Sequence, residues 1–176
     1  MSQRILIAGI GNVFLGDDAF GVEVVRRLAD RPLPCGVTVR DFGICGFDLA
    51  CAIVDGYDAV VLVDATPRGG APGTLYVIEP DVNSRIAENG SPPTLDGHTM
   101  SPDQVLQFVS ALGGPIPPLR LVGCEPAAMA NIDEPKTGLS PPVQRAVSDA
   151  LDLIVSLIDD FCVEPMPEGA SAATSG

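Results

Sequence analysis

Four aspartates and one histidine are the residues of this chain whose types and spacing could do chemistry together. Asp17 and Asp18 are adjacent and follow an apolar run that ends in glycine. Asp41 and Asp64 each stand near the end of a later apolar run, and His98, the only histidine, lies in a loop rich in proline and glycine. Converging carboxylates repel each other unless they are protonated, hydrogen-bonded or bound to a cation. Carboxylate and imidazole ligands suit zinc, nickel or another first-row divalent ion, so the sequence indicates a cation site.

Each of these residues also has an ordinary structural interpretation. Asp17 and Asp18 stand where a helix begins, and acids there can cap the helix and favour its dipole. Acids that end strands, as Asp64 does, occur both as turn formers and as site residues. His98 by itself fits a surface residue or one bonded within its own loop. Taken singly, none of these residues decides between structure and chemistry.

The opening segment "GIGNVFLGDDAFG", residues 9–21, looks like a nucleotide-binding loop. A dinucleotide fingerprint would need glycine where Phe14 stands, and no Gly-Lys-Ser/Thr follows as a P-loop requires. Carboxylates at the start of the following helix would also compete with phosphate for the same backbone N–H groups. The loop is therefore not built to bind an anion.

Composition excludes several classes of function. A formal net charge of −13 would repel nucleic acid and anionic lipid, so we expect no nucleic-acid partner. The longest apolar runs are broken by acids well before the roughly 20 residues that cross a bilayer, so we expect no membrane segment. The five cysteines are irregularly spaced, with no CxxC pair and no secretion signal. We interpret them as reduced core thiols of a cytoplasmic protein, and no GxSxG nucleophile motif is present.

Strand-like and helix-like patterns alternate along the chain. The helix that begins at Ser101 is well marked by an N-cap serine, a proline at the first helical position and a capping-box glutamine. The predicted strands are residues 4–9, 37–42, 59–63, 75–79 and 119–123. The predicted helices start near residues 20, 47, 102 and 141.

This order predicts an α/β fold of three layers, with a doubly wound, mostly parallel, five-stranded sheet flanked by helices. We expect one domain over residues 1–162 and a disordered tail over 163–176, which has little to bury. Ligand sites of such sheets lie beyond the carboxyl ends of the strands. The acids that follow the first three strands should therefore meet at one rim of the sheet.

Four motifs in this order resemble the maturation endopeptidases of nickel-iron hydrogenases, and the resemblance runs from about residue 4 to about 158. Residues 9–21 look like that family's GxGNxxxxDxxxG motif, and "DFGICG" at 41–46 is similar to its Asp-Gly-Gly-Thr-x-Gly segment. "VVLVDA" at 60–65 matches its third-strand acid, and "HTMSP" at 98–102 matches its histidine loop. The chain departs from the family pattern at Phe42, Ile44 and Cys45, and at residues 124–127.

The resemblance implies that Asp18, Asp64 and His98 are both the metal-contacting and the catalytic residues. It implies a cytoplasmic protease that removes a short C-terminal peptide from the precursor of the hydrogenase large subunit after nickel insertion. The nickel is carried by the substrate, and the site could bind other divalent metals. We expect supporting roles, in bracing the turn, capping the helix or orienting the loop, for Asn12, Asp17 and Asp41.

Two other classes of protein fit part of the pattern. A signalling receiver domain would bind magnesium at the acids and accept a phosphoryl group on Asp64. Against it, the acid pair begins eight residues past Gly9, and the only lysine, Lys136, lies in a polar loop well after the fifth strand. A non-catalytic nickel-binding chaperone would keep the same ligands but would release no peptide.

Overall fold

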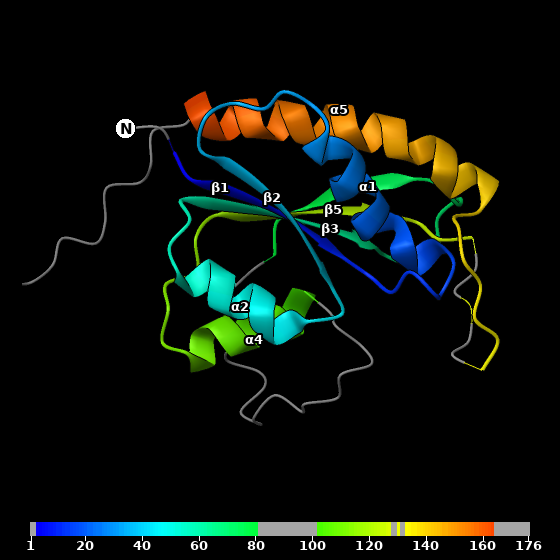
Figure 1. The fold of residues 1–176 in the computed structure, drawn as a ribbon, viewed down its shortest axis with the longest axis horizontal. Helices are drawn as coiled ribbons and strands as arrows, with labels where there is room; N and C mark the ends of the chain where they lie inside the picture. Colours follow the sequence, from blue (N-terminus) through cyan, green and yellow to red (C-terminus); the bar gives the residue numbers. More distant parts are fainter. Residues whose placement is uncertain (1–2, 81–101, 128–129, 131–132, 164–176) are drawn as a thin grey trace, which may run out of the picture.

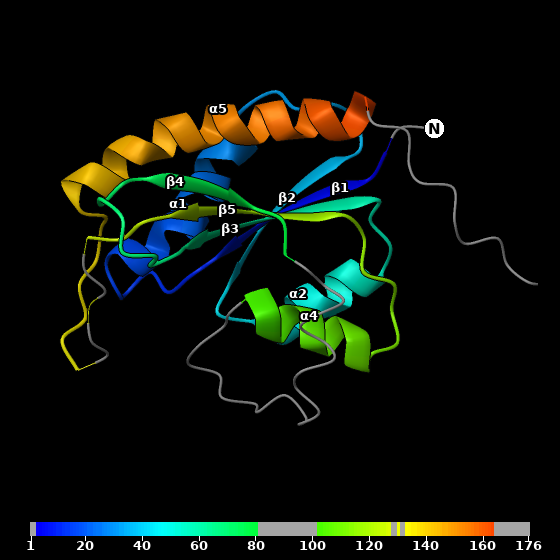
Figure 2. The same cartoon turned by 180° about the vertical axis from the view of Figure 1, so that it is seen from behind.

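A mixed five-stranded sheet forms the centre of the protein in a computed structural model, which describes residues 3–80, 102–127, 130 and 133–163. The strand order is β2-β1-β3-β5-β4 (Figures 1 and 2). Only β4, at one edge, is antiparallel to its neighbour, and the other neighbouring pairs are parallel. The strands are β1 (Ile5–Ile10), β2 (Val37–Gly43), β3 (Ala59–Ala65), β4 (Leu75–Ile78) and β5 (Leu119–Cys124).

Helices cover both faces of the sheet. In Figures 1 and 2, α1 and α5 lie on one face, and α2 and α4 lie on the other. Each face has its own apolar core, one with α1 and α5 and one with α2 and α4. The predicted three-layer, doubly wound α/β fold is therefore confirmed. The helices are η1 (Asp17–Ala19), α1 (Phe20–Ala29), α2 (Gly46–Val54), α4 (Pro102–Ala111) and α5 (Pro141–Val163).

The sequence pattern of the central elements explains this arrangement. All seven residues of β3 are buried, as expected of a β-branched run in a parallel strand that is covered on both faces. Helix α1 places Phe20, Val24 and Leu28 on one fully buried face at helical spacing. Burying each such side chain stabilises the fold by roughly 1.5–3 kcal/mol. The sheet and its covering helices thereby hold the ends of β1 and β3 in fixed positions.

The observed elements differ from the predicted ones mainly at their ends. Strand β3 continues to Ala65, two residues past its predicted end, because Asp64 still pairs with Gly123 of β5. Asp64 is therefore part of the rigid sheet and not of the loop that follows it. Helix α5 ends at Val163, next to the predicted domain boundary. The histidine loop, the predicted N-cap Ser101 and residues 164–176 lie outside the described residues.

The interpretation of the cysteines as core residues is wrong for most of them. All five are free, but only Cys124 is buried. Cys35 and Cys45 lie in connections between elements and Cys162 lies at the end of α5, and all three are exposed. Apolar neighbours in the sequence do not bury a residue at the end of an element. No described helix is long and apolar enough to cross a membrane.

Candidate active site

The loop between β1 and η1 brings Asp18 back towards the sheet. The backbone N–H of Asn12 donates a hydrogen bond of 2.7 Å to Oδ2 of Asp18. The side chain of Asn12 braces the same loop, because its Oδ1 accepts a hydrogen bond of 3.0 Å from the backbone N–H of Phe14. The Asp18 carboxylate is thus held by the turn from which it projects.

Two glycines allow this close packing. Gly11 has a φ of +138°, and a Cβ there would lie 1.8 Å from the carbonyl oxygen of Asp18. A Cβ on Gly21 of α1 would lie 2.0 Å from the carbonyl oxygen of Val63. The first turn of α1 therefore packs directly against β3, and this contact brings Asp18 to the end of the strand that carries Asp64.

Asp18 and Asp64 both have raised pKa values, and the charge of Asp18 affects Asp64. Burial raises the pKa of Asp64 well above its ordinary value, the charge of Asp18 raises it further, and the N–H of Ala65 acts in the opposite direction. Burial also raises the pKa of Asp18, against the effect of the N–H of Asn12. Two interacting carboxyls with raised pKa values readily share a proton or a cation. The structure therefore brings together two of the three predicted metal-contacting residues, and the third, His98, lies outside the described residues.

Asp17 does not cap the helix at which it stands, since neither η1 nor α1 has a side-chain cap hydrogen bond. Its carboxylate is buried and binds residues that are distant in the sequence. It accepts hydrogen bonds from the N–H of Ala127 at 2.8 Å, and from the N–H and hydroxyl of Ser140 at 2.6 and 2.8 Å. Asp17 therefore ties the loop that carries Asp18 to the connection before α5.

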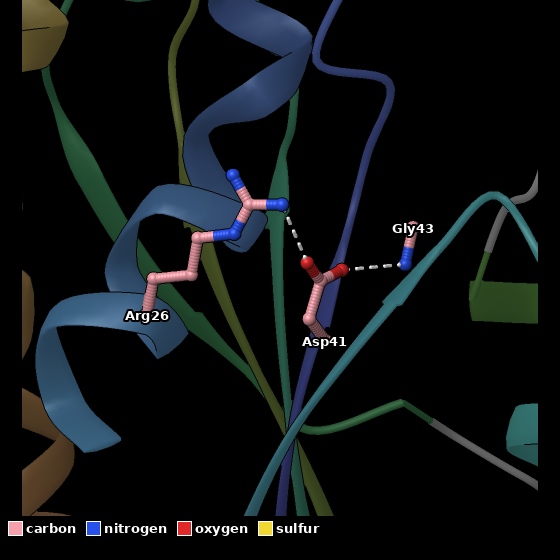
Figure 3. Close-up of polar contacts among 3 residues, drawn as sticks. All are labelled: Arg26, Asp41 and Gly43. Atoms are coloured by element: carbon pink, nitrogen blue, oxygen red, sulfur yellow. Dashed lines mark hydrogen bonds and ion pairs between the residues drawn. The ribbon is translucent and has the colours of Figure 1, made fainter.

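Asp41 lies on the edge strand β2, where it contacts Arg26 and Gly43 (Figure 3). Its Oδ2 forms an ion pair of 3.0 Å with Arg26 of α1, and its Oδ1 accepts a hydrogen bond of 2.9 Å from the N–H of Gly43. The Arg26 side chain is 59% exposed and that of Asp41 is 32% exposed, so solvent screens this pair and it contributes about 0–1 kcal/mol to stability. Asp41 thus braces the end of β2 and links it to α1.

Glu125 is a buried acid that the sequence interpretation did not single out. Its carboxylate accepts hydrogen bonds from the N–H of Arg68 at 2.8 Å, the N–H of Gly69 at 3.1 Å and the hydroxyl of Tyr76 at 2.8 Å. Burial acts to raise the pKa of Glu125, but these donors together lower it. The carboxylate thereby holds the loop that follows Asp64. Its position directly after β5 is the signal that would have found it.

Cys124 lies at the same rim but is not a suitable nucleophile. Burial, followed by the charges of Asp17 and Glu125, raises the pKa of its thiol to about 12. The thiol is therefore protonated at neutral pH, whereas cysteine nucleophiles act as thiolates. Within the described residues, no group of three or more His, Cys, Asp and Glu side chains is arranged to hold a metal.

A doubly wound sheet with paired acids at its rim is typical of α/β enzymes that act through carboxylates at strand ends. The sequence of this chain narrows the class. Residues 22–157 match the family described as hydrogenase maturation protease. The hydrogenase 2 maturation protease of Escherichia coli (strain K12) is 30% identical over 170 residues, which cover 96% of this chain and 98% of that protein. The chain therefore belongs to the hydrogenase maturation protease family and is an endopeptidase.

Solved structures agree with this assignment. A hydrogenase maturating endopeptidase from Escherichia coli superposes with a TM-score of 0.72 at 30% identity, over 94% of this chain and 98% of that one. A hydrogenase 2 maturation peptidase from a Thaumarchaeota archaeon gives a TM-score of 0.67 at 30% identity, over 89% of this chain and 99% of that one. Membership of an endopeptidase family excludes the receiver-domain and non-catalytic chaperone alternatives.

Proposed function

We propose that this endopeptidase removes the C-terminal extension of the precursor of a nickel-iron hydrogenase large subunit, and that it does so after nickel has been inserted. Several relatives support a role in hydrogenase assembly, among them the hydrogenase expression/formation proteins of Rhizobium leguminosarum and Bradyrhizobium diazoefficiens, 29% and 28% identical to this chain. Its free cysteines suit a reducing compartment, and we assign the reaction to the cytoplasm.

The acid pair is the observation that carries the proposal. Asp18 and Asp64 hold two carboxyls near each other with raised pKa values, and a cation between them would favour both charged forms. Nickel accepts carboxylate and imidazole ligands. The substrate's own nickel, contacted by Asp18, Asp64 and His98, is thus the recognition element of the reaction. Other divalent ions with the same ligand preferences would compete for this site.

The chemical step is the attack of water on the scissile peptide. The substrate's nickel fixes that peptide at the rim and polarises its carbonyl group. Asp18 or Asp64 accepts the proton of the attacking water and passes it to the departing amine as the peptide C–N bond breaks. The raised pKa values of both groups make them better bases near neutral pH than ordinary carboxylates. The protonated thiol of Cys124 takes no part as a nucleophile.

The test compares nickel-loaded with nickel-free precursor. Each form is mixed with the purified protein, and mass spectrometry measures the length of the precursor chain. We expect a shortened product from the nickel-loaded form only. Cleavage of both forms, or of neither, would contradict the proposal.

Variants then test the residues. We expect Asp64→Ala to abolish cleavage while the circular dichroism spectrum stays that of the parent. Asp159→Ala, which removes an exposed acid of α5, is the matched control and should cleave at the parental rate. Normal processing by Asp64→Ala would refute the assignment of Asp64 to the site.

A further inference from the structure

Three large apolar side chains are exposed at the rim that carries the acid pair. Phe14, Ile44 and Phe47 are 59%, 45% and 52% exposed, and we call these three residues the rim patch. Phe14 belongs to the loop before η1, while Ile44 and Phe47 come from the connection after β2 and the first turn of α2. The other large exposed apolar residues of the described chain are Val77 in β4, Leu112 just after α4 and Val163 at the end of α5.

Hydrogen bonds connect the rim patch to the acid pair. The backbone N–H of Gly11 donates a hydrogen bond of 2.9 Å to the carbonyl oxygen of Gly43, and this bond joins the loop of Phe14 to the loop of Ile44. Phe14 itself donates to the side chain of Asn12, the residue whose backbone N–H binds Asp18. The patch therefore begins within two residues of a group that contacts the proposed site.

The patch continues towards α4. The ring of Phe47 stands edge-to-face against the ring of Phe108, with centroids 6.2 Å apart. Phe47 is fixed by this contact and still leaves half of its surface exposed. Apolar groups gathered beside polar ones mark protein-binding sites, and aromatic side chains are frequent anchors of such sites. A second protein, not a small molecule, is the kind of ligand that this surface fits.

The position of the rim patch and the charge of the protein define the partner. An endopeptidase has to hold its substrate chain beside the bond that it cuts, and the patch is continuous with the loop of Asp18. The protein carries a formal charge of −13, and the exposed Asp48 stands next to Phe47. Such a field favours a positively charged partner and opposes an acidic one.

We propose that Phe14, Ile44 and Phe47 dock the precursor segment beside the scissile bond, and that this segment carries apolar side chains and net positive charge. The inference rests on the proposed function and names the surface that the substrate uses. It assigns binding to the rim patch and leaves the chemical step to the acid pair.

The experiment measures KM and kcat for cleavage of nickel-loaded precursor. We expect Phe14→Ser and Ile44→Ser each to raise KM at least tenfold with kcat within threefold of the parent, because docking contacts bind substrate and transition state alike. Val77→Ser and Val163→Ser remove comparable exposed apolar surface elsewhere and should keep KM within twofold. For Phe47→Ser, both KM and the free energy of urea unfolding are measured, because the Phe47 ring packs on Phe108.

Each outcome decides the matter. The docking surface is overturned if KM is unchanged in Phe14→Ser and Ile44→Ser, or if KM rises as much in the two control variants. The proposed function stands in either case. If the parent protein cleaves no precursor, the proposed function fails and the occupant assigned to the rim patch fails with it. KM should also rise between 50 and 300 mM salt, and a KM that does not respond to salt would overturn the positive charge of the segment.

Discussion

Replacing Asp17 by alanine should destabilise the protein strongly, although Asp17 does not belong to the acid pair. The substitution leaves three donors without their acceptor, the N–H groups of Ala127 and Ser140 and the hydroxyl of Ser140. Asp17 is only 2% exposed, so water cannot replace the carboxylate without rearrangement of the loop. The connection before α5 would then lose its fixed position against the loop that carries Asp18.

The size of the effect follows from the three bonds. A hydrogen bond to a charged group contributes about 1.5–3 kcal/mol, and the hydroxyl can rotate to another acceptor, so the two N–H groups account for most of the loss. We expect a decrease of about 3–5 kcal/mol in the free energy of unfolding. Removal of one negative charge from a chain with a net charge of −13 reduces charge repulsion and so favours the folded state. Salt, however, screens charges beyond about 8 Å. The loss of hydrogen bonds therefore dominates.

Urea unfolding measures this loss, and a double-mutant cycle with Ser140→Ala assigns it. Ser140→Ala alone removes only the hydroxyl bond and should lower stability by about 1 kcal/mol. The double variant should be less destabilised than the sum of the two, because Asp17 and Ser140 are bonded. Asp159→Ala should change stability by no more than about 0.5 kcal/mol. A change below about 1 kcal/mol for Asp17→Ala, or full additivity in the cycle, would refute the reasoning.

The remaining predictions concern Asp64 and Gly21. The folded pKa of Asp64 is raised above its ordinary 3.8, first by burial and then by the charge of Asp18. The stability that its neutral form gives is complete below that ordinary value and is lost as pH rises through the folded pKa. The side chain that Asp64→Asn introduces stays neutral at every pH. Urea unfolding in the presence of a chelator should therefore find the variant increasingly stable relative to the parent from pH 4 to 7. Parallel profiles of stability against pH for the two proteins would contradict this. Gly21→Ala should lower the free energy of unfolding by about 2 kcal/mol or more, because the new Cβ clashes with Val63. In the control Gly113→Ala the new Cβ meets no atom and only the φ of +73° causes strain, so this variant should lose less stability. Equal losses in the two variants would speak against packing as the cause.

Much of the fold could be predicted because periodicity reports burial. Strand β3 is apolar throughout because both faces are covered, and α1 repeats its apolar residues at helical spacing. The rule that ligand sites follow strand ends also brought Asp18 and Asp64 to one rim. That rule depends only on topology, so it could be applied to the sequence before any contact was known.

The sequence could not predict which partner each acid would take. Asp17 bonds residues 110 and 123 positions away, and Glu125 bonds a loop 56 and 57 positions away. Local patterns contain no information on such distant donors, so Asp17 was interpreted as a possible helix cap and Glu125 was missed. The cysteines were misplaced for a related reason, since local apolarity does not specify which side of an element faces the core.

Helix α5 runs from the rim of the sheet that carries the acids to the opposite rim (Figure 1). Ser140, the residue just before its first turn, is bonded to Asp17 beside the site, and the 23 residues of α5 span about 33 Å along the sheet to Val163. That far end lies near the start of β1 (Figure 1). The start of β1 and the end of α5 therefore lie at the rim opposite the acids. A large folded substrate can approach the acid pair and the rim patch from the other side without meeting the start of β1 or the end of α5.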